Sequence, residues 1–534
     1  MAVDTNGLLD AFIADRMQAA RIPGLALALT DRERTLRVAT FGFANLDARV
    51  PMRPETLFAF GSIGKSFTSI ALLQEAEAGR VDLDAPVTAY LPWFSVRSPY
   101  APISLRHLLS HTAGITSGAD FSPDSRAEVY ALRHAEVGAP PDAHFHYSNA
   151  GYKILGLVLE RLTGRAYAEI IAERILDPLG MADTVAAITN EARSRMAVGY
   201  LPFYDDRPMP PDRLLAPAPW LETATADGCL AATAGDLATY LRMLLNRGAG
   251  PRGHLLAEDS FAQLIAPRIA AWEGRSYGLG LATWTEAGHA VIGHGGSMPG
   301  YQSSICGDLD AGLGAVVLIN GPGDPHAIAD AALAALRADR AGTALSIPAV
   351  VRDRTEVADA ASYAGVYTSG NRRFIVGAEQ GRLILADGEV RAPLEPRLRD
   401  YFYANHPAYA RYLLRFVRQG EVVMEAFHGP DWYPNERFAG PPAPPYPPEW
   451  AAYPGHYRAH NPWLSNFRVV LRKGSLALIY PTGTETPLVP RDDGAFRVGE
   501  EAHNPETIRF ADIVEGQALR ATLSLGSYFR FFTP

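Results

Sequence analysis

The spacing of apolar and polar residues predicts a mixed α and β arrangement in the first two thirds of the chain. Apolar residues at helical spacing alternate with short apolar runs bounded by turn residues. The pattern predicts helices at residues 7–20, 62–78, 149–162, 233–245 and 325–340, a short amphipathic turn at 105–110, and strands at 25–30, 35–43, 289–293, 302–307 and 313–320. Strands at both ends with helices between them favour an α+β domain, whose antiparallel sheet is completed by both ends of the segment. The proline-rich residues 202–219 are expected to form a long surface excursion.

Beyond residue 350 the chain contains an internal repeat. Tyr363-Ala-Gly-Val-Tyr367 matches Tyr453-Pro-Gly-His-Tyr457, and three further blocks follow in the same order at a period of about ninety residues. Short strands and turns replace helices here, which favours two small antiparallel β-barrels of lipocalin type. The proline-dense residues 440–448 join the copies. We therefore expect domains at residues 1–345, 350–440 and 449–534.

Composition and charge narrow the range of partners. The net charge of -9 is spread along the chain without a basic run, so nucleic acid and anionic membranes are poor partners. No apolar run approaches the roughly 20 residues that span a bilayer, and the first residues do not read as a signal peptide. Cys229 and Cys306 match no metal or disulfide framework, and the pair His144 and His146 lacks further ligands. We expect a cytoplasmic protein without metal or cofactor, and a homodimer is compatible with the sequence.

One short motif carries candidate chemistry. Ser62 and Lys65 lie one turn apart at the start of a predicted helix, so their side chains share a face. Burial would lower the pKa of the amine and allow it to take the serine proton. Two other interpretations are open from this motif alone. Ser62 could be a helix cap beside a solvated lysine, or Gly64-Lys65-Ser66 could end a phosphate-binding loop, although that loop requires glycine where Ala59 stands.

Two later stretches supply partners for this pair. Tyr147 can relay a proton if nearby cations lower its pKa, and the Asn149 amide can hold a lysine and a substrate carbonyl. His294-Gly295-Gly296-Ser297 closes a predicted strand, where the two glycines leave room for a substrate backbone. The N–H of Ser297 is then a second oxyanion donor beside that of Ser62. His111 is expected to be structural.

Taken together these motifs resemble a known enzyme family. Ser62-x-x-Lys65, Tyr147-Ser148-Asn149 and His294-Gly295-Gly296, with 108–114 and 230–237, are similar to the penicillin-recognising serine hydrolases. The resemblance is to the group of class C β-lactamases, D-alanyl-D-alanine carboxypeptidases, D-aminopeptidases and related esterases. It covers residues 7–340 and implies a β-lactamase/transpeptidase-like sheet with helices. The two barrels resemble the D-aminopeptidase branch, in which a barrel loop reaches the active site; Asp492-Asp493 and the turn at Gly483 are candidates for that loop.

The resemblance implies a serine hydrolase that forms an acyl-enzyme on amide or ester bonds of small substrates. Ser62, Lys65 and Tyr147 would be catalytic, Ser62 and Ser297 would form the oxyanion hole, and Asn149, His294, Gly295 and Gly296 would bind substrate. Relatives with lysine at the His294 position favour carboxylate substrates, whereas histidine titrates near neutrality. Position 294 therefore favours D-amino-acid amides, short peptides or short-chain esters. An acyltransferase, a weak β-lactamase, a non-catalytic ligand-binding member and a nucleotide-binding protein are the alternatives.

Overall fold

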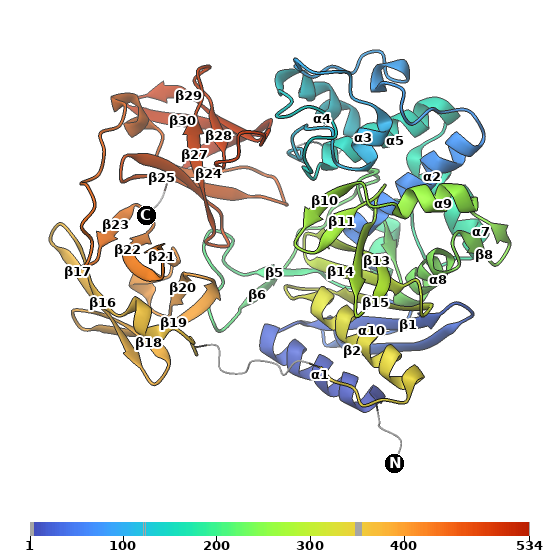
Figure 1. Ribbon diagram of the computed structural model, residues 1–534, viewed down its shortest axis with the longest axis horizontal. Coiled ribbons are helices and arrows are strands. Elements are labelled where there is room, and N and C mark those ends of the chain that lie inside the picture. Colours follow the sequence, from blue (N-terminus) through green and yellow to red (C-terminus); the bar gives the residue numbers. More distant parts are fainter. Residues whose placement is uncertain (1–4, 121, 123, 348–354, 533–534) are drawn as a thin grey trace. The chain divides into compact units, whose positions relative to one another are not determined.

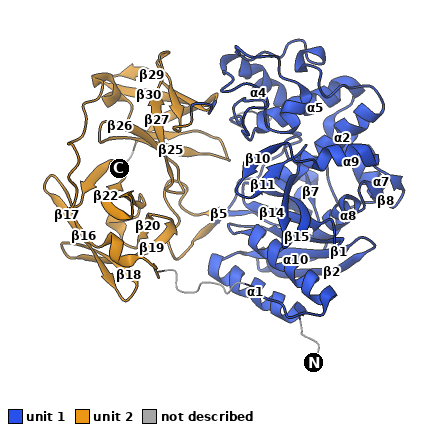
Figure 2. Cartoon of the chain, viewed as in Figure 1, with its two compact units in different colours: residues 1–201, 216–350, 502–505 blue, residues 202–215, 351–501, 506–534 orange. Residues whose placement is uncertain are grey.

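The chain folds into two compact units (Figure 2). Unit 1 comprises residues 1–201, 216–350 and 502–505, and unit 2 comprises residues 202–215, 351–501 and 506–534. This computed structural model describes residues 5–120, 122, 124–347 and 355–532. The predicted start of the first barrel, residue 350, lies outside the described residues.

Unit 1 is built on a nine-stranded antiparallel sheet in the order β10-β11-β12-β13-β14-β15-β1-β2-β3. Strand β1 (Gly24–Asp31) lies between β15 (Leu313–Ile319) and β2 (Thr35–Asn45), with Leu25 opposite Ile319. The two ends of the segment therefore complete one sheet, as the apolar pattern predicts. The remaining strands are β3 (Val50–Pro51), β10 (Ile269–Trp272), β11 (Arg275–Tyr277), β12 (Ala282–Glu286), β13 (His289–Met298) and β14 (Tyr301–Asp308).

Helices cover both faces of this sheet (Figure 1). Helices α1 (Thr5–Ala20) and α10 (Pro325–Ala341) form a hydrophobic core with Leu25, Leu27 and Leu29 of β1. Helix α8 (Ala234–Leu245) packs on β1 and β15, where the absent side chain of Gly314 makes room for Leu241. Because successive side chains of a strand point to opposite faces of the sheet, the side chains of β1 pack alternately against the helices on each face.

The segment between β3 and β10 contains the remaining helices of unit 1. Helix α2 (Gly64–Glu77) packs against α5 (Asn149–Thr163), and most of its residues are buried. The predicted helix over 62–78 thus forms, preceded by a 3-10 turn at Gly61–Ile63. The other elements are β4 (Phe58–Ala59), α3 (Leu105–Leu109), α4 (Ser125–Ala131), α6 (Tyr167–Ile171), α7 (Asp177–Leu179), β5 (Tyr200–Pro202), β6 (Leu215–Pro217), β7 (Ala231–Ala232), β8 (Ala249–Gly250), β9 (Gly253–His254) and α9 (Glu258–Ile265).

Unit 2 contains the two copies of the repeat, each an eight-stranded antiparallel sheet. The second sheet is a closed barrel, and the first brings its outer strands together through a bridge between Tyr367 and Asn435. The Tyr367 hydroxyl donates to Tyr363 O at 2.7 Å, and the Tyr457 hydroxyl donates to Tyr453 O at 2.7 Å. The predicted repeat is therefore reproduced down to single hydrogen bonds.

The strands of unit 2 follow one another in chain order. The first sheet comprises β16 (Gly365–Ser369), β17 (Arg372–Glu379), β18 (Arg382–Asp387), β19 (Val390–Leu398), β20 (Tyr401–Ala404), β21 (Leu414–Gln419), β22 (Val422–His428) and β23 (Asp431–Pro434). The second comprises β24 (Gly455–Arg458), β25 (Asn466–Arg472), β26 (Ser475–Ile479), β27 (Glu485–Pro490), β28 (Phe496–Val498), β29 (Thr507–Val514), β30 (Gln517–Leu523) and β31 (Gly526–Phe531).

The proline-rich segment is more than a surface excursion. Residues 202–215 belong to unit 2, where Asn466 Nδ2 donates to Asp205 O at 2.8 Å. Asp206 forms an ion pair with Arg468 at 3.1 Å. The sequence could not predict these contacts, because the partners lie more than two hundred residues further along the chain.

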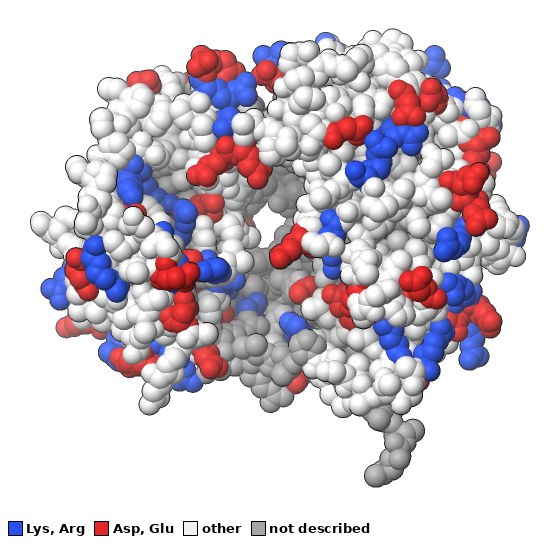
Figure 3. All heavy atoms as spheres, viewed as in Figure 1, with Lys and Arg blue, Asp and Glu red and all other residues white. Residues whose placement is uncertain are grey.

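Charged groups of both signs are interspersed over the visible face of each unit (Figure 3). Within the part of the chain that the structure describes, every helix is too short or too polar to cross a membrane.

Candidate active site

Ser62 lies in a tight turn at the head of α2. Gly61 adopts a φ of +56°, and a Cβ there would approach Ser297 N to 2.6 Å. Phe60 N donates to Leu230 O at 3.1 Å, which fixes the chain on the opposite side of the turn. Glycine is therefore required at residue 61, both for its backbone conformation and for the close approach of β13.

Lys65 is completely buried beneath Ser62. Its Nζ contacts three acceptors: Ser62 Oγ at 3.0 Å, Asn149 Oδ1 at 2.8 Å and Asp227 O at 2.6 Å. All three acceptors are neutral, and no described carboxylate forms an ion pair with the amine. Burial lowers the pKa of Lys65 to about 8, although the more distant charges of Asp227 and Asp120 oppose this shift.

Tyr147 lies in the loop before α5 and lines the same pocket as Ser62. The Lys65 Nζ is 4.8 Å from the centre of its ring. Loss of solvation raises the pKa of the Tyr147 phenol, and its interaction with the Ser62 hydroxyl lowers it by less. The expectation that nearby cations lower this pKa does not hold, so the phenol stays protonated.

The Tyr147-Ser148-Asn149 loop is held by hydrogen bonds from residues that do not line the pocket. Ser148 Oγ caps α5 by accepting from Gly151 N at 3.0 Å and donates to Thr116 O at 2.7 Å. His111, which is buried, accepts from Ser148 N at its Nδ1 at 3.0 Å. The histidine expected to be structural therefore fixes the backbone between Tyr147 and Asn149.

His294 is buried within β13 and is a neutral group. Its Nδ1 donates to Gly295 O, so its Nε2 accepts from the Tyr277 hydroxyl at 2.9 Å. Burial lowers the pKa of His294 to about 3, against an opposing effect of the Gly295 carbonyl. The expectation of titration near neutrality is therefore wrong for the folded chain.

The glycines after His294 let β13 pass directly beside the turn that carries Ser62. A Cβ on Gly296 would lie 1.8 Å from Phe60 O, which also accepts a hydrogen bond from Ser303 Oγ at 2.7 Å. Strand β13 extends to Met298, beyond the predicted end at Gly293. The Ser297 amide is thereby placed against Gly61, the residue before Ser62.

A pocket of about 640 Å³ opens in front of these groups. It is lined by Ser62, Tyr147, Trp272, Arg275, Ala282, His294, Gly295, Gly296, Ser297, Gln302 and His326. Lys65 and Asn149 lie behind it, joined by their hydrogen bond. The structure thus brings all eight predicted site residues together at one place.

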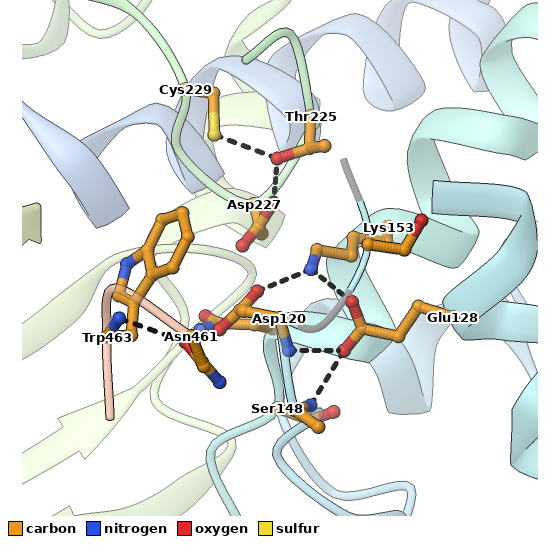
Figure 4. A network of polar contacts seen from close by, with 12 residues as sticks. Asp120, Glu128, Ser148, Lys153, Thr225, Asp227, Cys229, Asn461 and Trp463 are labelled. Carbon is orange, nitrogen blue, oxygen red and sulfur yellow. Dashed lines mark hydrogen bonds and ion pairs between the residues drawn. The ribbon is translucent and has the colours of Figure 1, made fainter. Parts of the chain in front are cut away.

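Sequence reasoning misses several groups around the site. The Asp227 carbonyl completes the surroundings of Lys65, and no motif marks it. Lys153 lies one turn after Asn149 and forms 2.5 Å ion pairs with Asp120 and Glu128 (Figure 4). Its position four residues after Asn149 is the one signal that places it on the same face of α5.

The two barrel positions considered for a loop near the site lie within unit 2. Asp493 forms an ion pair with Arg509 at 2.8 Å, and Gly483 packs against Leu413. Residues 502–505 are the part of the barrel sequence that belongs to unit 1.

Comparisons with known proteins agree with this geometry. Penicillin-binding protein 4 of Amycolatopsis lactamdurans is 29% identical over 317 residues, which cover 56% of this chain and 81% of the relative. The octameric penicillin-binding protein homologue from Pyrococcus abyssi has a TM-score of 0.59 and 27% identity, over 80% of this chain and 99% of that chain. A D-stereospecific amidohydrolase from Streptomyces sp. has a TM-score of 0.50 and 26% identity, over 64% of this chain and 100% of that chain.

The family profile described as Beta-lactamase matches residues 9–339, which contain Ser62, Lys65, Tyr147 and His294. Members of this family are generally serine hydrolases. Because the match spans more than half of the chain, the protein belongs to the beta-lactamase family of penicillin-recognising serine hydrolases.

Proposed function

We propose that this protein is a serine hydrolase that cleaves amide or ester bonds of small substrates through an acyl-enzyme on Ser62. The observation that carries the proposal is the amine of Lys65, buried among neutral acceptors and 3.0 Å from Ser62 Oγ. An ammonium has three N–H donors for its three acceptors. A neutral amine keeps two donors for Asn149 and Asp227 and turns its lone pair to Ser62. Deprotonated Lys65 is then the general base.

The first step is the formation of the acyl-enzyme. Neutral Lys65 takes the proton of Ser62, and Oγ attacks the carbonyl carbon of the substrate. The N–H groups of Ser62 and Ser297 receive the oxyanion of the tetrahedral intermediate. Tyr147, whose phenol stays protonated, donates its proton to the leaving group as the bond to the carbonyl carbon breaks, and recovers a proton from Lys65.

The second step is hydrolysis of the acyl-enzyme. A water molecule gives a proton to the same neutral amine and attacks the acyl carbon. Ser62 Oγ takes that proton back from Lys65 as its bond to the acyl carbon breaks, which restores the neutral amine. Asn149 holds the Lys65 amine through its Oδ1 at 2.8 Å. The edge of β13 at Gly295 and Gly296, which lines the pocket, pairs with the substrate backbone. Neutral His294 lends no positive charge at that edge. Short peptides, D-amino-acid amides and short-chain esters are therefore the proposed substrate class.

A substrate panel run on wild type and Ser62→Ala tests this proposal. The panel contains D- and L-amino-acid p-nitroanilides, short-chain p-nitrophenyl esters and a chromogenic cephalosporin. We expect turnover of an ester or anilide that falls by about 10³-fold or more in Ser62→Ala. Wild-type rates in the variant on every accepted substrate would overturn the proposal.

A further inference from the structure

Lys153 is a buried cation that the proposed mechanism does not use. It lies on α5 one turn after Asn149, the residue that holds the Lys65 amine. Its side chain is 3% exposed, and its Nζ pairs with Asp120 Oδ1 and Glu128 Oε2, each at 2.5 Å (Figure 4). Burying these charges costs their hydration, and well-packed apolar side chains are often at least as stabilising as a buried ion pair. Stability alone therefore does not explain this cation.

The ion pairs of Lys153 also hold a loop that contacts the Tyr147 segment. Glu128 accepts from the backbone N–H groups of residues 119 and 120 at 2.8 and 3.1 Å. In the same loop, Ser117 Oγ donates to Tyr147 O at 3.0 Å. Lys153 is thus connected to the site on two sides, through this loop and through its own helix.

The charges behind Lys65 act on its amine in opposite directions. Burial is the main cause that lowers the pKa of Lys65; the carboxylates of Asp227 and Asp120 oppose it, and the charge of Lys153 adds to it. Other titratable groups around the amine are uncharged near neutral pH, because burial raises the pKa of a thiol or phenol and lowers that of an imidazole. These groups are Cys229, Tyr147, Tyr152, His111 and His294. The balance between the two carboxylates and Lys153 therefore affects how readily the amine loses its proton.

Lys153 keeps its own charge in this cluster. Burial disfavours its ammonium form, but the charges of Asp227, Asp120 and Glu128 raise its pKa. Burial raises the pKa of Asp120 to about 6, and the charge of Lys153 is the largest effect that opposes this rise. Without Lys153, three acidic side chains would share this region with no cation among them.

We propose that Lys153 is a positioning residue for the hydrolysis at Ser62. Its fixed charge offsets the carboxylates of Asp120 and Asp227, so that they do not hold the proton on the Lys65 amine. The role is indirect, because Lys153 is not among the described residues that line the pocket. The inference rests on the proposed function and names the charge that adjusts its general base.

Opposite shifts of the pH profile test this inference. The measurement is kcat/KM for p-nitrophenyl acetate between about pH 5 and about pH 10, with Ser62→Ala as the blank; the general base appears as an apparent pKa. Asp120→Asn removes an anion, so the apparent pKa should fall by about one pH unit. The rate below it should then rise by up to about tenfold. Lys153→Met removes the cation, so the apparent pKa should rise.

Two further variants separate the charge of Lys153 from its surroundings. Protonation of Asp120 would offset part of the rise in Lys153→Met, so the same substitution is also made in the Asp120→Asn background. There the apparent pKa should rise by about one pH unit relative to Asp120→Asn alone. Lys153→Arg retains a permanent charge and should keep an apparent pKa close to that of wild type.

Arg337→Met is the matched control. Arg337 lies on α10, its side chain is 17% exposed, and it pairs with the buried carboxylate of Asp308 at 2.7 Å. It is not among the charges that act on Lys65. Its loss should reduce the free energy of unfolding, as loss of Lys153 does, but should leave the apparent pKa unchanged.

The possible failures are distinguishable. Ser62-dependent hydrolysis with one apparent pKa in wild type, Asp120→Asn and both Lys153→Met variants overturns this inference and leaves the proposed function in place. A lower rate in Lys153→Met without a shift of the profile in either background would show a structural role only and also overturns it. If Lys153→Met does not fold, the charge-balanced double variant decides: an apparent pKa equal to that of Asp120→Asn overturns the inference. Hydrolysis that does not depend on Ser62, or no hydrolysis of any ester or anilide, overturns the proposed function itself.

Discussion

Unit 1 and unit 2 both bury cationic side chains, but they surround them with different partners. In unit 1, Lys65 is 0% exposed and contacts only neutral acceptors. In unit 2, the Arg472 side chain is 6% exposed and contacts the Glu485 carboxylate at 2.5 Å. The first arrangement makes loss of a proton easier, whereas the second holds both charges in place.

The pKa values follow this difference. Burial lowers the pKa of Lys65 to about 8. Burial alone would raise the pKa of Glu485, but Arg472 and Arg415 hold it below its ordinary value. Lys153 in unit 1 keeps its charge as Arg472 and Glu485 do. Burial opposes the charge of Lys153, but Asp227, Asp120 and Glu128 raise its pKa. A buried cation thus loses its proton more readily where its direct partners are neutral and keeps it where they are acidic.

Replacement of the Lys65 amine should have the largest effect. Lys65→Met removes the proposed base and should lower kcat/KM for ester hydrolysis by about 10³-fold or more, equivalent to about 4 kcal/mol. Lys65→Arg keeps a cation that cannot lose its proton, and its loss of activity should be similar. Thermal unfolding identifies variants that fail to fold. Near-wild-type rates in folded Lys65→Arg would contradict the role of the neutral amine.

Breaking the ion pair of Arg472 and Glu485 should reduce the stability of unit 2 without changing the pKa of Lys65. Glu485→Gln leaves Arg472 buried without an acidic partner and should lower the free energy of unfolding of unit 2 by about 3 kcal/mol. The measurement is urea unfolding followed by circular dichroism. Glu485 is not among the charges that act on Lys65, so the pH profile should keep its midpoint.

Glu379→Gln is the matched control for Glu485→Gln. Glu379 pairs with Arg391 at 2.6 Å, and both side chains are more than half exposed. Removal of this exposed pair should have little effect on unfolding. Equal destabilisation by the two substitutions would show that burial does not distinguish them.

A carboxylate placed beside Lys65 should form a buried ion pair with it, like that of Arg472 and Glu485. Asn149→Asp puts an anion where the amide oxygen lies 2.8 Å from Nζ. The pKa of Lys65 should rise, and each unit of increase should lower the rate at neutral pH by about tenfold. The pH profile of ester hydrolysis measures the shift. Asn149→Ala removes the acceptor without adding charge, so a profile that moves equally in both variants would refute this explanation.

The motifs around Ser62 could be predicted because each lies within one local element. Ser62 lies in the 3-10 turn that leads directly into the helix of Lys65, and Ser148 caps the helix that starts at Asn149, so short residue spacings fix these relations. The repeat likewise revealed the two barrels of unit 2 through the spacing of matched tyrosines, glycines and leucines.

The electrostatics of the site could not be predicted, because they depend on distant residues. The Tyr277 hydroxyl, which forms the hydrogen bond to His294 Nε2, comes from β11. This three-residue strand is too short to show an alternation of apolar residues. Strands β10 and β12, of four and five residues, were also missed, as was Arg275 in β11. The Asp227 carbonyl reaches Lys65 across more than one hundred and fifty residues of sequence, and no side-chain pattern marks a backbone acceptor.

The most direct test of the account is the pH dependence of covalent labelling at Ser62. Wild-type protein is treated with a fluorophosphonate between about pH 6 and about pH 10, and the adduct is located by peptide mass spectrometry. We predict a single adduct on Ser62, with a rate that rises with pH and levels off above an apparent pKa of about 8, set by Lys65. A rate that does not change with pH, or an adduct on another residue, would contradict the account.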